Sequence, residues 1–298
     1  MLSQAKKAEI LTLIASGMPK GEIARLAEVN PSSITKLLKT RKRVLIVSDS
    51  HCGGAYGLTP PDWQYKSSSF YGQQVELWGW FKRTVEMLKP DICIFAGDAI
   101  DGKGKRSGGI EQITTSFKKQ LVMFRKVLET INAPKVTMVR GTPYHVGTEE
   151  AYEDFMGLMK TDFEVKIGGH EFPIVHGIQF DVKHKIGSSS VPYGSLTPLA
   201  KAKLWNRIWN DHEGQPKADV FIRGHAHKFD FCGNQEYLGI TCPTLCGWGS
   251  KFGVEQCEKV VDTGMLWLDI YDGSTLDNLH LQRDLPKLRT QRVKTYEL

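Results

Sequence analysis

Five short apolar runs, each ending in an aspartate or a histidine or just before one, constrain the fold of this chain more than any other feature. They span residues 44–48, 91–96, 135–139, 180–183 and 219–223, and longer amphipathic stretches separate most of them. This alternation is typical of βαβ units arranged around a sheet. We therefore predict an α/β domain that begins at about Arg43.

The residues that follow these runs carry the chemistry. They are Asp49-Ser50-His51, Gly97-Asp98-Ala99-Ile100-Asp101, Arg140-Gly141-Thr142-Pro143-Tyr144-His145, His184 and Gly224-His225-Ala226-His227. Loops at the carboxyl ends of strands converge on one crevice in open α/β sheets, so we expect these side chains to meet. Carboxylates combined with imidazoles suit manganese, iron or zinc, and one carboxylate can serve two ions. A single histidine is usually structural, but five of the nine lie in these strand-end segments.

The ordered blocks D-x-H, G-D-x-x-D, a lone H and G-H-x-H between Val44 and His227 resemble the calcineurin-like metallophosphoesterases. The resemblance implies a metallophosphoesterase-type αββα sandwich, in which two packed mixed sheets are flanked by helices. It also implies two divalent metal ions, most often Mn²⁺, with Fe, Zn or Ni as alternatives. It assigns the first ion to Asp49, His51, Asp98 and His227. It assigns the second ion to the bridging Asp98 together with His184 and His225.

Two blocks depart from the family pattern. The third block of the family reads G-N-H-D/E, whereas this chain has Thr142 in place of the metal-binding Asn. Either Thr142 or water then fills that position, and the second site is weaker or prefers another metal. In the fourth block His176 competes with His184. We prefer His184, because it ends a cleaner alternating strand, and keep His176 as the alternative ligand.

The implied reaction is in-line hydrolysis of a phosphate ester by a metal-activated water. His145 aligns with the catalytic histidine of the family and would protonate the departing alkoxide, while Asp101 would orient it. Arg140 and Lys103 are the candidates for contacts with phosphate, although an exposed, solvated loop would have the same sequence at Lys103.

The first 42 residues form a separate predicted domain of three helices, near 4–16, 20–28 and from Pro31 onward. Residues 1–43 contain nine Lys or Arg and three Glu, so this segment alone carries the net charge of +6, and the remainder has thirty residues of each sign. The stretch GMPKGEIARLAEVNPSSITKLLK resembles the helix-turn-helix of resolvase and invertase DNA-binding domains. The resemblance makes the third helix the recognition helix. The expected nucleic-acid contacts are Ser32, Ser33, Thr35, Lys36, Lys39 and Arg41.

Three functions follow from this organisation. We favour a nuclease or nucleic-acid phosphatase whose N-terminal domain binds DNA or RNA. The second is a phosphatase or phosphodiesterase for small molecules or proteins, in which the helices serve protein contacts. The third is a DNA-binding regulator with an inactive phosphoesterase fold, which the lost Asn makes conceivable and the retained ligands argue against. Oligomeric state is not predicted.

Other features of the sequence bear on where the protein is located and on the state of its cysteines. No apolar run reaches the roughly 18 residues that a membrane span needs, and MLSQAKKAEI is unlike a signal peptide, so a cytoplasmic protein without membrane contact is expected. We predict that the six cysteines are reduced thiols. A zinc site at Cys232, Cys242, Cys246 and Cys257 is the less favoured alternative. The aromatic residues at 52–74 are expected to hold that loop to its own domain more than to stack on bases.

Overall fold

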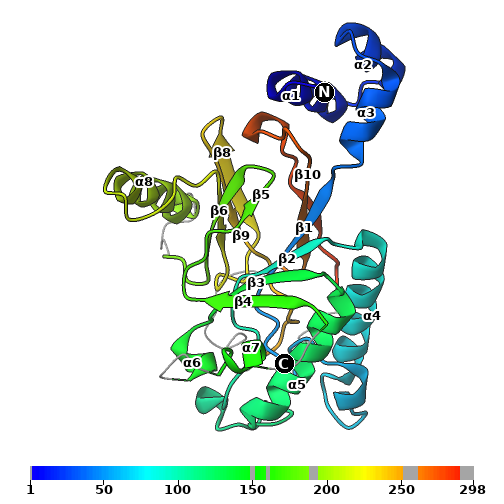
Figure 1. The fold of residues 1–298 in the computed structure, drawn as a ribbon. Coiled ribbons are helices and arrows are strands. Elements are labelled where there is room, and N and C mark those ends of the chain that lie inside the picture. Colours follow the sequence, from blue (N-terminus) through cyan, green and yellow to red (C-terminus); the bar gives the residue numbers. More distant parts are fainter. Residues whose placement is uncertain (1, 148–151, 159–161, 188–193, 251–260, 289–298) are drawn as a thin grey trace, which may run out of the picture.

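The computed structural model describes residues 2–147, 152–158, 162–187, 194–250 and 261–288. Their strands form two sheets that pack face to face, and helices cover the outer sides (Figure 1). This is the sandwich of two mixed sheets flanked by helices that was predicted, and the fold class is confirmed.

The first sheet has six strands, and its central strands run parallel. In spatial order they are β11 (Gln282–Asp284), β10 (Met265–Ile270), β1 (Lys42–Val47), β2 (Ile92–Phe95), β3 (Lys135–Val139) and β4 (Glu164–Gly168). β1 to β4 are mutually parallel, whereas β10 is antiparallel to β1 and β11 is antiparallel to β10. The carboxyl ends of β1, β2 and β3 therefore lie at one edge.

The second sheet has five strands. In spatial order they are β5 (Ile174–Val175), β6 (Ile178–Lys183), β7 (Val220–Arg223), β9 (Tyr237–Thr241) and β8 (Asp230–Asn234). β6, β7 and β9 run parallel, and the two outer strands pair antiparallel to their neighbours. Each of the five predicted runs overlaps a strand: β1, β2, β3, β6 or β7.

The layers follow from the alternation of side chains along the strands. In β1, Leu45 and Val47 belong to the apolar core shared with α4 (Tyr71–Leu88) and α5 (Phe117–Ile131). Val44 and Ile46 belong to the core between the two sheets. Successive residues of a strand point to opposite faces, so one uniformly apolar strand fills both cores.

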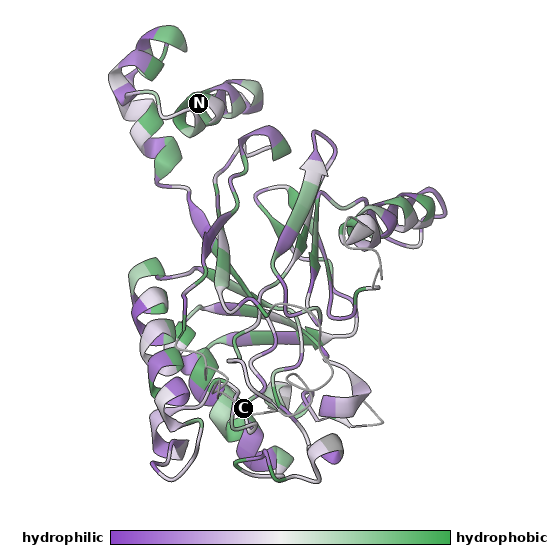
Figure 2. Cartoon of the chain, turned by 180° about the vertical axis from the view of Figure 1, so that it is seen from behind, coloured by the Kyte–Doolittle hydropathy of each residue, from purple (hydrophilic) through white to green (hydrophobic). Residues whose placement is uncertain are grey.

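The helices outside these cores are shorter or more exposed. α8 (Thr197–Asp211) lies against β9 and β7 on the outer side of the second sheet. The single-turn helices α6 (Pro143–Val146) and α7 (Phe155–Leu158) follow β3. Figure 2 shows hydrophobic residues along the strands and mixed hydrophilic and hydrophobic residues along the helices, as a sandwich with solvated outer faces requires.

The N-terminal helices form a small unit with a core of its own. α1 (Gln4–Ala15), α2 (Lys20–Leu26) and α3 (Pro31–Leu38) enclose buried residues such as Ile10, Ile23 and Ile34. The side chain of Asn30 accepts a hydrogen bond from the amide of Ser32 and so caps α3. All three helices lie within a few residues of the predicted positions.

This helical unit contacts the sheets at the amino end of β1 (Figure 1). Nζ of Lys7 lies 2.5 Å from Oδ2 of Asp272, and Tyr271 packs against the core of the unit. α3 ends at Leu38 and β1 begins at Lys42, so three residues connect them, and the predicted boundary at residue 42 falls on the first residue of the strand. The six residues of β1 span about 20 Å and separate the unit from the strand's carboxyl end.

Among the residues that the structure describes, no helix combines the length and the apolar character that crossing a bilayer requires.

Candidate metal centre

The carboxyl ends of β1, β2, β6 and β7 bring together the six residues that the sequence proposes as metal ligands. One group is built on β1 and β7. Nε2 of His227 lies 3.2 Å from Oδ1 of Asp49 and 3.1 Å from Nε2 of His51. Ligand atoms of Asp49, His51 and Asp98 all lie within 4.8 Å of one another.

A second group shares the same central carboxylate. Ligand atoms of Asp98, His184 and His225 also lie within 4.8 Å of one another, and Nε2 of His184 is 3.0 Å from Oδ2 of Asp98. Asp98 and His184 are buried, whereas His225 is exposed and marks the open side of the centre. Asp98 therefore belongs to both groups, as a bridging carboxylate must.

The backbone at these positions is unusual. Five of the six residues have positive φ, between 44° and 67°: Asp49, His51, Asp98, His225 and His227. Non-glycine residues rarely adopt this region, and the surrounding structure must offset a cost on the order of 1 kcal/mol or more at each position. Left-handed residues directly after the strands turn the carboxylates and imidazoles into the crevice.

Two glycines of the motifs make the close approach feasible. Gly97 has a φ of +92°, and a Cβ on it would come within 2.6 Å of the His184 ring. A Cβ on Gly141 would overlap a carboxylate oxygen of Asp98. Both positions require glycine because their backbones pass directly behind a ligand side chain.

The tautomer of His184 tests whether a cation fits. Nδ1 of His184 lies 2.6 Å from the carbonyl oxygen of Ala96, which can only accept, so this nitrogen carries a proton. In the neutral ring Nε2 then presents a lone pair toward Oδ2 of Asp98, and this buried atom has no hydrogen-bond partner within the described chain. A lone pair facing a carboxylate is repulsive unless a cation or a proton lies between them, so the donor set fits a metal ion.

His51 is fixed in the same way. Its Nδ1 lies 2.9 Å from Oδ1 of Asp101, so Nδ1 donates and Nε2 faces His227 and Asp49 with its lone pair. Burial lowers the pKa of His51, and repulsion from His145 and His227 lowers it further. The hydrogen bond and the charge of Asp101 raise it, but they do not reverse the direction. A neutral imidazole with a directed lone pair is the form that a metal requires.

The carboxylates are ionised. Burial alone would raise the pKa of Asp98, but His184, His145 and His51 hold it at about 2. Burial has the same effect on Asp49, and His227, His184 and His51 likewise hold its pKa well below the ordinary value. The centre thus gathers negative charge that only nearby imidazoles compensate.

In the metal-free protein, the imidazoles of His145, His184 and His227 supply the positive charge. Burial lowers the pKa of His184, but the negative charge of Asp98, 3.0 Å from Nε2, raises it to about 9. His227 is raised well above its usual value by Asp49, against the effect of burial. Protons on these imidazoles therefore supply, in the metal-free protein, positive charge that metal ions would supply when bound.

Asp101 organises the catalytic candidate His145. Nδ1 of His145 lies 2.9 Å from the backbone oxygen of Asp101, and Nε2 lies 3.9 Å from Oδ2 of Asp98. Burial lowers the pKa of His145, whereas hydrogen bonding to Asp101 and the charge of Asp98 raise it to about 9. The carboxylate of Asp101 accepts further hydrogen bonds from Tyr56 (2.9 Å) and Gln112 (2.6 Å).

Thr142 occupies the position of the missing Asn. Its amide donates to Oδ1 of Asp98 at 2.7 Å, and its hydroxyl lies 3.3 Å from both carboxylate oxygens of Asp98. The hydroxyl therefore lies beside the shared carboxylate.

Sequence reasoning missed Glu153. This fully buried carboxylate accepts hydrogen bonds from the amide of Ala99 (2.6 Å) and from the amide of Gly141 (2.7 Å). It thus ties the loop of Asp98 to the loop of Thr142 and His145. Burial and the charge of Asp98 raise its pKa to about 7, although the two amides oppose this. No motif marks Glu153, because its role depends on contacts with residues 12 and 54 positions away.

Sequence reasoning also missed Gln112, and it did not place Tyr56 or Cys246 beside the centre. Sγ of Cys246 lies 4.0 Å from Nδ1 of His227. The aromatic residues at 52–74 were expected to hold that loop to its own domain. The hydroxyl of Tyr56 does so by donating a hydrogen bond to the carboxylate of Asp101. Cys232, Cys242 and Cys246 are free thiols, and Cys257 lies outside the described residues.

Three proposed residues lie apart from the ligand groups. The alternative ligand His176 is exposed in the β5–β6 turn, and its Nε2 lies 2.8 Å from the carbonyl oxygen of Thr40, beside the helical unit. The turn places His176 at the amino end of β1, away from both ligand groups. Arg140 forms a two-point ion pair with Asp154 (2.8 and 3.1 Å), and Lys103 is exposed.

The proposed nucleic-acid residues lie in α3 and in the segment that follows it. Ser32, Lys36, Lys39 and Arg41 are exposed, whereas Ser33 and Thr35 are half-buried. The hydroxyl of Thr35 accepts from Nζ of Lys20 at 2.5 Å. Lys7, Lys42 and Arg43 pair instead with Asp272, Asp91 and Asp269 of the larger domain, so part of the positive charge of residues 1–43 is used internally.

The chain has distant structural likenesses. No protein-family model and no curated protein matches its sequence. A novel archaeal phosphodiesterase is 13% identical, with a TM-score of 0.45 over 82% of this chain and 99% of that one. Vps29 of Entamoeba histolytica in complex with Zn²⁺ is 15% identical, with a TM-score of 0.38 over 82% and 98%. A predicted phosphoesterase of Streptococcus pneumoniae is 12% identical, with a TM-score of 0.34 over 83% and 98%. Such likenesses are too distant to carry an argument about activity.

Proposed function

We propose that the chain is a metal-dependent phosphoesterase that hydrolyses phosphodiester bonds of nucleic acid. One observation carries the proposal: Nδ1 hydrogen bonds hold the rings of His51 and His184 so that their Nε2 atoms point at the carboxylates of Asp49 and Asp98. A hydrolytic centre with two divalent ions needs this arrangement of directed imidazoles around a shared carboxylate.

The residues divide into two ligand sets. Asp49, His51, Asp98 and His227 would hold one ion, and Asp98, His184 and His225 the other, with the hydroxyl of Thr142 nearby. When bound, two divalent cations supply an acidified water and neutralise charge on the phosphoryl oxygens.

His145 is suited to protonate the leaving group. Its Nδ1 is committed to the backbone oxygen of Asp101, and at neutral pH the raised pKa of His145 leaves Nε2 protonated as well. The Nε2 proton lies on the side of Asp98, where the ester would bind. His145 therefore acts as the general acid for the departing oxygen, and Asp101 positions its ring.

The helical unit supports nucleic acid as the substrate. Arg25, Lys36, Lys39 and Arg41 are exposed and form no ion pair with an acidic residue of the described chain, whereas basic residues at the junction pair with the larger domain. Unpaired cations on one small unit are what phosphate backbones require. A basic binding unit and a hydrolytic centre on one chain favour an enzyme that binds nucleic acid through its helices and cleaves it at the centre.

Metal-dependent cleavage assays test the proposal. We expect purified protein with Mn²⁺ to hydrolyse bis-p-nitrophenyl phosphate and single-stranded or plasmid DNA, and Asp98→Asn to abolish both activities. The triple variant Lys36→Gln/Lys39→Gln/Arg41→Gln should retain hydrolysis of the small diester but cleave DNA more slowly, with a weaker dependence on salt.

The other outcomes identify the other functions. Hydrolysis of the small diester without any effect of the triple variant on DNA would indicate a phosphatase or phosphodiesterase for small molecules or proteins. DNA binding without metal uptake or turnover would indicate an inactive fold in a regulator.

A further inference from the structure

A hollow of about 290 Å³ lies between the edge strand of the second sheet and the segment that leads into β11. Its apolar walls include Phe229, Phe231, Leu279 and Leu281, and its polar rim is formed by His280 and Arg283. In Figure 1 β8 and β10, the strand next to β11, rise toward the helical unit on either side of this region.

The position of the hollow links the two functional parts of the chain. At one end, Phe229 lies two residues beyond the proposed ligand His227. At the other end, Leu279 follows Asn278, whose Nδ2 lies 3.5 Å from the carbonyl oxygen of Ala8 in α1. The walls therefore extend from the metal centre to the helical unit.

The chemistry of the walls suits a base and its phosphate. The rings of Phe229 and Phe231 stack at 5.8 Å with an interplanar angle of 26°, and about half of Phe231 is exposed. The guanidinium of Arg283 lies 5.0 Å from the centre of the Phe229 ring, and no carboxylate pairs with it in the described parts of the chain. The adjacent Asp284 faces away and accepts hydrogen bonds from Trp80 and Thr84.

We propose that this hollow, the Phe231 groove, binds a single-stranded stretch of nucleic acid on its way to the metal centre. The inference rests on the proposed function and deepens it by naming the form of the substrate. A free base stacks on the exposed ring of Phe231, and Arg283 pairs with the phosphate beside it. A duplex would not suffice, because its bases are already stacked and paired.

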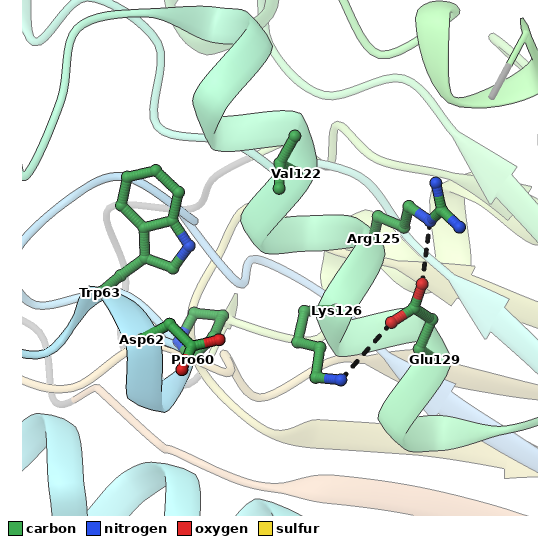
Figure 3. Close-up of a pocket in the computed structure, with 7 residues that line it drawn as sticks. All are labelled: Pro60, Asp62, Trp63, Val122, Arg125, Lys126 and Glu129. Atoms are coloured by element: carbon green, nitrogen blue, oxygen red, sulfur yellow. Dashed lines mark hydrogen bonds and ion pairs between the residues drawn. The ribbon is translucent and has the colours of Figure 1, made fainter.

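A second hollow in the described chain provides a matched control (Figure 3). It also combines an aromatic ring, Trp63, with cationic side chains, on α5. However, Arg125 and Lys126 both pair with Glu129, at 2.9 and 3.6 Å. Its charge is thus partly satisfied internally, and we expect no contribution to strand binding.

Binding of a labelled 12-nucleotide oligothymidylate to the full chain in EDTA tests the groove by fluorescence anisotropy. Loss of one stacked base predicts that Phe231→Ala binds about tenfold more weakly. Arg283→Gln should lower the slope of log K against log salt by about 0.7, the value for one single-strand phosphate contact. Arg125→Gln, the control from the other hollow, should bind like the wild type.

An abasic oligomer of the same length separates stacking from charge. We expect Phe231→Ala to bind it as the wild type does, because no base is present. Wild-type affinity of both groove variants for oligothymidylate, or an equal loss of affinity for the abasic strand, would overturn the proposal.

Hydrolysis of bis-p-nitrophenyl phosphate with Mn²⁺ separates the groove from the proposed function. Phe231→Ala should hydrolyse this small diester at the wild-type rate, since it does not occupy the groove. If the wild type fails to hydrolyse it while the binding pattern holds, the enzymatic function fails and the groove stands. If hydrolysis occurs but the variants bind normally, only the groove fails.

Discussion

Asp101 contacts His145 through its backbone oxygen, 2.9 Å from Nδ1, while its carboxylate oxygen lies 2.9 Å from Nδ1 of His51. One residue therefore fixes both a proposed metal ligand and the proposed general acid. Because the second D of the G-D-x-x-D block makes both contacts, the orientation of the proton donor is set relative to the ions.

Replacing His145 with Ala should slow hydrolysis by about 10²- to 10⁴-fold, the usual contribution of general acid catalysis, while metal content is unchanged. The loss should be smaller for a p-nitrophenyl ester than for an alkyl ester, because p-nitrophenolate leaves without a proton. Turnover of both esters and metal analysis of the purified variant measure this. Equal losses for the two leaving groups would contradict the role of His145.

Metal affinity should rise with pH. The pKa values of His145 and His184 are raised from 6.5 to about 9, so the stability that they give to the metal-free protein is complete below pH 6.5 and is lost as the pH rises through 9. A metal ion needs deprotonated His184, so binding releases protons at neutral pH. We expect the Tm in EDTA to fall between pH 6.5 and 9.5, and the Tm with Mn²⁺ to fall less. A metal-free Tm that increases over this range would exclude this account.

Glu153→Ala should destabilise the protein and weaken metal binding. It leaves the buried amide of Ala99 and the half-buried amide of Gly141 without an acceptor, at about 1–3 kcal/mol each, and it frees the loops that carry the proposed ligands. Urea unfolding should show a loss of about 2–5 kcal/mol, and Mn²⁺ titration a loss of about 10- to 100-fold in affinity.

Glu129→Gln is the matched control for Glu153→Ala. This side chain is 38% exposed and pairs with Arg125 on the surface of α5, so its removal should leave both quantities within experimental error. Glu153→Gln retains one acceptor oxygen and should fall between the wild type and Glu153→Ala. Wild-type metal affinity in Glu153→Ala would contradict a link between the two loops and the centre.

Thr142→Asn should strengthen the second metal site. A carboxamide oxygen is a better ligand for a hard divalent ion than a neutral hydroxyl, and the hydroxyl of Thr142 already lies 3.3 Å from Asp98. We expect a gain of about tenfold in the weaker Mn²⁺ affinity, comparable to effects of single residues around metal sites. Thr142→Val, which keeps the shape but lacks the hydroxyl, is the control. An unchanged affinity in Thr142→Asn would show that water, not this side chain, completes the site.

The strand ends were predictable because two local signals coincide there. Apolar runs such as Val44–Val47 identify buried strands, and polar residues directly after them must lie at the carboxyl edge. The helices of the N-terminal unit were also predictable, since Asn30, Pro31 and Gly17 mark their ends.

Contacts between distant loops were not predictable. Glu153 occupies its position because β2 and β3 lie side by side, which places the amides of Ala99 and Gly141 on either side of its carboxylate. The choice between His176 and His184 also depended on the fold, because only the turn after β5 shows that His176 faces the other end of the sheet. The alternation of residues before His184 favoured it as the ligand, but periodicity and spacing contain no information on the contacts that His176 and Glu153 make.

The short junction between α3 and β1 has a consequence for how the chain would work on a polymer. Only residues 39–41 separate α3 from β1. The ion pair between Arg43 and Asp269 fixes the amino end of β1 to the neighbouring strand β10. The strand then covers about 20 Å before the proposed ligands begin. A nucleic acid bound by the helices, as proposed, would therefore be cleaved at a fixed distance from its site of binding.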